Sequence, residues 1–139
     1  MSKNGVISAV VCILALASST YAEMAYFAHN GRLDTVALMG KGKRVGKGTT
    51  DRIYSMGDRK FGSAWSIEFS GLMDCEKAGK YQFVVSSDDG SALFIDNKEI
   101  IMNDGHHGSV TKKKTVSLPA GKHQVNLLYF NSSGGHVLT

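Results

Sequence analysis

The chain has 139 residues, enough for one domain but too few for two independent hydrophobic cores. Hydrophobic residues make up 42% of it and charged residues 20%, with a formal net charge of +4, so the composition excludes a chain that is disordered throughout. Sixteen Gly against one Pro predict many tight turns, and two Cys without a C-x-x-C spacing exclude a disulfide-rich scaffold and a zinc site of that type.

Residues 1–22 have the pattern of a secretory signal peptide. Lys3 gives a positive start, residues 6–17 form an apolar run, and small residues lead to Ala22, after which we expect cleavage. A membrane anchor is the alternative, but a span needs about 20 apolar residues and this run has only about a dozen. We therefore expect a secreted or cell-surface protein whose mature domain is residues 23–139.

Cleavage would remove Cys12 and leave Cys75 as a single thiol in an oxidising compartment. Such a thiol is buried, paired with another chain, or separated from its partner. The last four residues, 136–139, alternate as a strand interrupted midway would. We therefore expect a domain truncated at its C-terminal end, with any partner of Cys75 and any further domains beyond Thr139, and we leave the oligomeric state open.

Between residues 31 and 57, glycines punctuate a basic run, Lys41–Lys47. This composition buries little apolar area, so we expect a long exposed loop or an irregular edge hairpin. This run and a second one, residues 112–114, suggest anionic glycans or a membrane surface as partners, and the simpler interpretation is a solvated face. Binding to nucleic acid is not expected, because no aromatic residues are interleaved with the basic ones.

The rest of the chain predicts strands. Residues 65–70 alternate apolar and polar side chains, as a strand with one face in a core does. Further apolar runs follow, separated by turn residues, at 81–85, 92–95, 99–102, 116–118 and 125–130. The turns recur at roughly the 8–12-residue spacing typical of a β-sandwich or barrel. No window of helical length has a helical period, so the predicted fold class is all-β.

Asp88 and Asp89 are adjacent carboxylates between two predicted strands, and Gly90 follows them. Their mutual repulsion would be relieved by Ca²⁺, which takes oxygen ligands at ~2.3–2.6 Å and favours several carboxylates. Gly90 would let the backbone turn sharply beside the ion. On local sequence alone, the alternative is a solvated Asp-Gly turn whose Asp side chain caps backbone amides.

Other chemistry finds less support in the sequence. His106 and His107 are adjacent, and neighbouring side chains on a strand point to opposite faces, so we expect them to be structural rather than ligands of one metal ion. An approach of Asp104 to the Asp88–Asp89 loop is compatible with the sequence. Adjacent carboxylates cannot straddle a glycosidic bond at the ~5–9 Å separation that its hydrolysis needs. No Ser-His-Asp or Cys-His arrangement stands out, so we expect no catalytic residues and no enzyme.

Several motifs occur in an order that resembles the protective-antigen-type domain, called the PA-fourteen domain. They are Trp65–Leu72, Ala78–Phe83, Ser87–Asn97, Leu118–His123 and Leu128–Phe130. The resemblance is strong from Trp65 to Tyr129 and weak from Met24 to Lys60. It implies an antiparallel β-sandwich, often barrel-like, of the kind found in yeast flocculins, epithelial adhesins and other secreted or surface proteins.

In the lectin members of that family, two consecutive Asp residues joined by a cis peptide bind Ca²⁺ and contact sugar hydroxyls. Asp88 and Asp89 match this pair, and Asn131 matches an Asn that completes the calcium site from a later loop. The resemblance therefore implies a Ca²⁺-dependent carbohydrate-binding, adhesin-like module whose partners are glycans on a cell surface or matrix. The alternative function is a structural or protein-interaction domain of a larger extracellular protein, without sugar binding.

Asn131 also begins an N-glycosylation acceptor pattern with Ser132 and Ser133. A glycosylated Asn cannot easily serve as a calcium ligand, so these two interpretations exclude each other. A plain turn at the end of a strand is the third.

Overall fold

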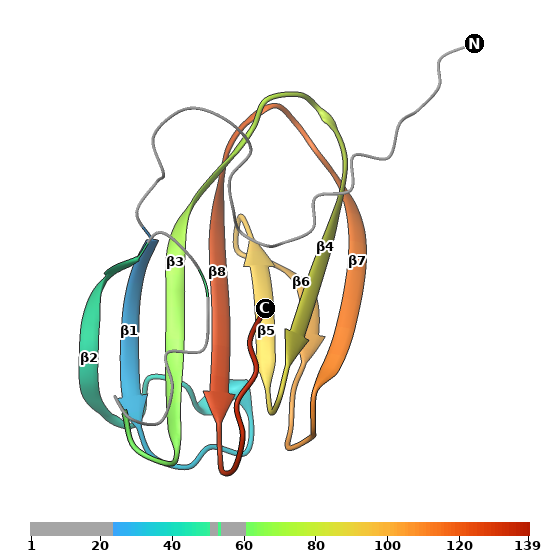
Figure 1. Ribbon diagram of the computed structural model, residues 1–139. Helices are drawn as coiled ribbons and strands as arrows, with labels where there is room; N and C mark the ends of the chain where they lie inside the picture. The colour runs from blue at the N-terminus through green and yellow to red at the C-terminus, as the bar shows by residue number, and fades with distance from the viewer. Residues whose placement is uncertain (1–23, 51–52, 54–60) are drawn as a thin grey trace.

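The computed structural model describes residues 24–50, 53 and 61–139 (Figure 1). The predicted signal peptide, residues 1–22, lies outside the described residues. Within the described ranges, no helix is long and apolar enough to cross a membrane.

The described residues form strands and one short 3₁₀ helix, which confirms the all-β prediction. In chain order they are β1 (Met24–Asn30), η1 (Val36–Leu38), β2 (Lys43–Thr50), β3 (Trp65–Cys75), β4 (Gly79–Ser87), β5 (Ser91–Ile95), β6 (Lys98–Asn103), β7 (Val110–Leu118) and β8 (Gly121–Asn131). The larger sheet has six strands in the order β2-β1-β3-β8-β5-β6, and the smaller has two, β4-β7. Every strand pair is antiparallel.

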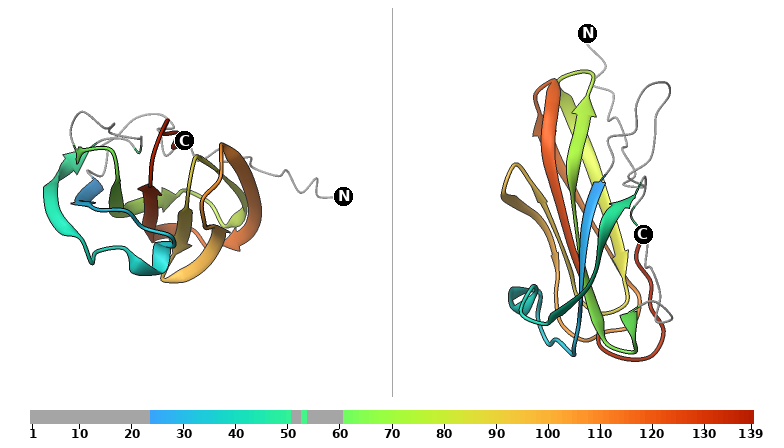
Figure 2. Two further views of the ribbon diagram at one scale, coloured as in Figure 1. Left: turned by 90° about the horizontal axis from the view of Figure 1, so that it is seen from below. Right: turned by 90° about the vertical axis from the view of Figure 1, so that its left-hand side faces the viewer.

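The chain crosses between the sheets at four connections, and two of them, β3–β4 and β7–β8, lie at the top of Figure 1. The β4–β5 and β6–β7 connections and the segment after β8 lie together at the opposite end, at the bottom of that view (Figures 1 and 2). Segments far apart in the sequence therefore meet at one end of the sandwich.

The main core lies between the two sheets and follows from the alternation of apolar side chains along each strand. The inward faces of β3, β4 and β8 are lined by nine buried side chains: Trp65, Ile67, Phe69, Tyr81, Phe83, Val85, Val125, Leu127 and Tyr129. The Trp65 ring meets the Tyr129 ring edge-on, with their centroids 5.4 Å apart. Because buried side chains lie at the start of β3 and alternate along β4 and β8, the loops at these strand ends have fixed starting points.

Cys75 lies at the end of β3 and is buried, which is the first of the three states expected for a single thiol. Burial raises the pKa of the Cys75 thiol, and a hydrogen bond with Tyr81 offsets only part of this effect. A thiol with a raised pKa carries little thiolate and reacts slowly.

A smaller apolar cluster covers the outer face of the larger sheet. Its buried members are Leu33 and Val36, from the segment 31–42 between β1 and β2, and Ala92 and Phe130, from β5 and β8. The segment 31–42, which was expected to be part of an exposed loop or edge hairpin, is thus packed against the sheet through the buried side chains of Leu33 and Val36. Residues 43–50 form β2, an exposed edge strand paired with β1, so the edge-hairpin expectation holds for this half.

At the end of the sandwich opposite the Asp88–Asp89 loop, His123 joins two turns. Its Nδ1 lies 2.6 Å from Asp96 Oδ2 and its Nε2 lies 2.9 Å from the Pro119 carbonyl oxygen. Both ring nitrogens face acceptors, so the protonated ring can donate a hydrogen bond from each of them. The hydrogen bond with Asp96 is the main cause of a raised pKa of His123, and the same bond lowers the pKa of Asp96.

This pair predicts how stability depends on pH. A raised pKa of His123 in the folded state gives stability that is fully present below the ordinary histidine pKa and is lost as pH rises through the raised value. The lowered pKa of Asp96 gives stability that is lost as pH falls through the lowered value. We expect the free energy of unfolding, measured with urea, to fall between pH 6 and pH 9 in the wild type and to fall less in H123Q. Parallel pH profiles of the two proteins would contradict this assignment.

Candidate functional site

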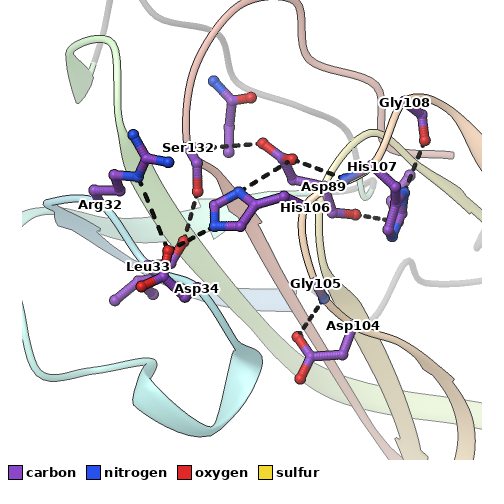
Figure 3. A network of polar contacts seen from close by, with 12 residues as sticks. Arg32, Leu33, Asp34, Asp89, Asp104, Gly105, His106, His107, Gly108 and Ser132 are labelled. Atoms are coloured by element: carbon purple, nitrogen blue, oxygen red, sulfur yellow. Dashed lines mark hydrogen bonds and ion pairs between the residues drawn. The ribbon is translucent and has the colours of Figure 1, made fainter.

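The Asp88–Asp89 pair lies in the short connection between β4 and β5, at the end of the sandwich where the other loops meet (Figure 1), and Figure 3 shows Asp89 from close by. Asp89 turns the chain with a left-handed φ of 60°, a conformation that Asp tolerates better than most residues. No peptide bond among the described residues is cis, so the link between Asp88 and Asp89 is trans. The cis peptide that the resemblance implies is therefore wrong for this structure, in which the left-handed Asp89 makes the turn.

Asp89 is buried, with a relative exposure of 6% for the residue, and its carboxylate is held by backbone donors. The N–H of Ser132 donates to Oδ2 at 2.8 Å and the N–H of His107 donates to Oδ1 at 3.3 Å. The N–H of Asp89 in turn donates to the His107 carbonyl at 2.8 Å. A buried charge needs such partners, and they fix the carboxylate between the β6–β7 connection and the segment after β8.

The ring of His106 lies between two carboxylates at the rim of this site (Figure 3). Its Nε2 is 2.6 Å from Asp34 Oδ1 and its Nδ1 is 3.7 Å from Asp89 Oδ1. The ring also meets the Phe130 ring edge-on, with their centroids 5.9 Å apart. Arg32 lies on the outer side of Asp34, with its Nε 3.9 Å from Oδ1. The segment 31–42 thus adds charged groups to the rim.

The two histidines have different partners. The ring of His107 contacts the carbonyl oxygens of Gly108 at 2.8 Å and Asn103 at 3.2 Å, away from Asp34. His106 lies beside both Asp89 and Asp34. No motif in the sequence marks this position, because the contact depends on how the segment 31–42 folds back.

Asp104 approaches the acidic loop, as the sequence allowed. Its Oδ1 lies 2.9 Å from the point where a Cβ on Gly90 would stand. The carboxylate accepts hydrogen bonds from the Thr35 hydroxyl and from the N–H groups of Val36 (2.8 Å) and Gly105 (2.9 Å). Desolvation acts to raise the pKa of Asp104, but these three hydrogen bonds outweigh it and lower the pKa. Asp104 therefore fastens the start of η1 to the site.

Asp88 is half-buried, and its N–H donates to the Val137 carbonyl at 3.0 Å. Asn131 is fully buried at the end of β8, and its side-chain nitrogen donates to the Ser63 carbonyl at 3.4 Å. The segment after β8 reaches the acidic loop, as the resemblance implies, and the contact described with Asp89 runs through the N–H of Ser132. Sequence reasoning missed Ser132 because a backbone donor leaves no signature in the side chains.

The burial of Asn131 also bears on the glycosylation pattern. A glycan must project into solvent, and this side chain has a relative exposure of 0%. The folded domain therefore has no room for a glycan at Asn131 without displacing the end of β8.

The atoms of this region that could bind a metal ion are mainly oxygens, the ligands that Ca²⁺ prefers. In the part of the chain that the structure describes, no three side chains of His, Cys, Asp or Glu are grouped closely enough to hold a metal ion. A calcium site built on Asp88 and Asp89 would therefore need amide or carbonyl oxygens to complete its 6–8 ligands. Asn131 and the carbonyl groups of the converging loops are of the right chemical type.

A family model described as a PA14 domain matches residues 24–138. Among solved structures, a PA14 sugar-binding domain from an RTX adhesin is 17% identical, with a TM-score of 0.70 over 86% of this chain and 88% of that one. The PA14 domain of the antifreeze protein MpAFP is 16% identical, with a TM-score of 0.68 over 89% and 85%.

A subtype-switched epithelial adhesin 9 A domain from Candida glabrata, in complex with β-lactose, is 10% identical, with a TM-score of 0.62 over 85% of this chain and 78% of that one. At these identities the likenesses to solved structures show the fold. No curated protein matches the sequence.

Proposed function

The chain belongs to the PA14 domain family, and from that premise we propose that it is a Ca²⁺-dependent carbohydrate-binding module of a secreted or cell-surface protein. The fold is shared with a sugar-binding adhesin domain and with an adhesin domain that holds β-lactose, which supports glycan binding in general. In this proposal the chain binds glycans of a cell surface or matrix without catalysing a reaction on them. It acts alone or beside further domains of the same protein.

The observation that carries the proposal is the fixed, buried carboxylate of Asp89 at the end of the sandwich where the loops converge. A buried carboxylate costs stability unless it has partners, and this one is oriented by donors from two separate segments. We propose that Asp88 and Asp89 hold the ion and contact the sugar, with Asn131 as a further calcium ligand. Calcium, when bound, would supply a positive centre that vicinal sugar hydroxyls can join.

The rim residues would then meet the sugar beyond the ion. Asp34 and Arg32 have side-chain exposures of 75% and 68%, so their polar groups can exchange water for sugar hydroxyls. They belong to the segment 31–42, which Asp104 fastens to the acidic loop. We therefore propose that this segment helps to select the sugar.

Thermal unfolding with calcium and then with chelator tests the metal site. Because a ligand that binds only the folded state raises stability, we expect Tm to rise by on the order of 10 °C at about 100 times the dissociation constant. The rise should vanish in D89N, which keeps the shape of the side chain and removes its charge. D34N is the matched control, since it removes a nearby exposed carboxylate, and it should keep the rise.

A glycan array with the wild type and D89N tests the sugar site. We expect a defined set of glycans to bind the wild type in calcium and none to bind D89N. If calcium shifts no melting temperature and the wild type binds no glycan, the alternative function is favoured, a structural or protein-interaction domain.

A further inference from the structure

The smaller sheet is uniformly basic. Its strands, β4 and β7, have nine residues each, and they carry Lys80, Lys112, Lys113 and Lys114 but no Asp, Glu or Arg. β7 is exposed along almost its whole length. In the described part of the chain, no ion pair involves any of these lysines. Among the described residues these lysines therefore lack the ion pairs with acids that a mixed surface provides.

The strand register distributes these lysines over both sides of one edge. Lys113 lies opposite Val84 and Lys80 opposite Ser117, so both belong to the outward face, whereas Lys112 and Lys114 face the other way. Lys112 already uses one of its hydrogen-bond donors, because its Nζ donates to the Met102 carbonyl at 2.7 Å. Lys113 and Lys114 are exposed and free of such contacts in the described structure. The three consecutive lysines of β7 therefore project alternately to the two sides of this exposed edge strand.

Edge protection explains part of this pattern but not all of it. Lysines on an edge strand discourage pairing with other chains, and the second basic run, on β2, also lies on an edge strand. On β2, however, the guanidinium of Arg44 packs over the Phe27 ring at 4.8 Å, and glycines interrupt the basic residues. Three consecutive lysines repel one another on β7, and a polyanion would relieve this repulsion.

We propose that the β4–β7 sheet binds a linear anionic polysaccharide, sulfated or rich in uronic acid, lying along β7. Hydroxyl and amide groups accompany the lysines on the outward face: Gln82, Thr111, Thr115 and Ser117. They suit an anionic sugar, which offers both charge and hydroxyl groups. The proposed surface does not include the carboxylates of Asp88 and Asp89, so binding there needs no calcium.

Two other polyanions fit this surface less well. Single-stranded nucleic acid needs exposed aromatic side chains for stacking, and both aromatic residues of the sheet, Tyr81 and Phe83, are buried. An anionic membrane is favoured by large apolar groups that insert into it, and the exposed apolar side chain on these strands is the small Val110, at 39%.

Calorimetric titration of the purified chain with dextran sulfate, in chelator, tests the proposal independently of the calcium site. We expect binding at 50 mM salt that weakens steeply by 300 mM, and no binding of uncharged dextran. The variant K113Q/K114Q should bind roughly ten- to thirtyfold more weakly. K43Q/K47Q, which removes the same charge from the edge strand β2, should change the affinity less than twofold. Circular dichroism would show that both variants are folded.

Three results would overturn the proposal. One is a wild type that does not bind dextran sulfate at 50 mM salt. Another is an equal loss of affinity in the β7 and β2 variants, which would indicate net charge alone. The third is equal or tighter binding of single-stranded DNA or of phosphatidylserine vesicles, which would assign the surface to a different partner.

Discussion

Replacing Phe130 with alanine is expected to lower the free energy of unfolding by about 3–5 kcal/mol, the range for truncating a buried aromatic side chain. Phe130 has a relative exposure of 0% and packs with Leu33 and Val36, the two anchors of the segment 31–42. Its backbone N–H donates to the Gly90 carbonyl, and its ring meets that of His106. One side chain thus supports both the acidic loop and the segment over the sheet.

Urea unfolding at neutral pH measures this loss. F27A is the matched control, since Phe27 lies on the same outer face but is only half-buried, and it should cost about 1 kcal/mol. F130A should also weaken any binding at the Asp88–Asp89 loop, because the neighbouring Ser132 holds the Asp89 carboxylate. A loss in F130A no greater than in F27A would contradict the role given to this ring.

The second large effect is expected for G90A, at about 2–4 kcal/mol. A Cβ at Gly90 would stand 2.1 Å from Cε1 and 2.6 Å from Cζ of Phe130, and 2.9 Å from Asp104 Oδ1. Contacts this short force the ring or the loop to move, and overpacking of a buried site costs on the order of 1–3 kcal/mol or more. G108A is the control from a neighbouring loop, where a Cβ would meet nothing within 4 Å, and it should change stability by about 0.5 kcal/mol or less.

A double-mutant cycle tests whether the Phe130 ring causes this loss. F130L removes the two ring atoms nearest the new Cβ while keeping apolar contacts in the cluster. In that background G90A should cost less than in the wild type, with a coupling energy of roughly 1–2 kcal/mol. Additive losses would show that the strain lies elsewhere, for instance against Asp104.

Much of the fold follows from local patterns in the sequence. The alternation in residues 65–70 placed Trp65, Ile67 and Phe69 on one face, and all three have a relative exposure of 0%. Apolar alternation of this kind is a strong signal, because a shift of the strand register by one residue would turn every core side chain into solvent. The expectation for residues 31–57 did not include the burial of Leu33 and Val36. These are single apolar residues in a polar stretch, and single residues form no periodic pattern from which burial can be predicted.

The candidate site was only partly predictable. Asp88 and Asp89 could be singled out because adjacent acids are conspicuous, and the motif series implied that a later segment would join them. The trans link between them, the donation by Ser132 and the approach of His106 could not be read from the chain. Each of these depends on the position of another loop, and a backbone N–H looks the same in every residue except proline.

The sequence by itself determined that this protein is a small antiparallel sandwich with an acidic turn between two strands, since strand periods and turn residues are local properties. Only the tertiary structure decided which groups surround that turn and that the lysines of β7 lie on an exposed edge strand, without an ion pair among the described residues. The physical reason is that contacts and charge fields depend on distances between segments far apart in the chain. Those distances are set by the packing of the two sheets.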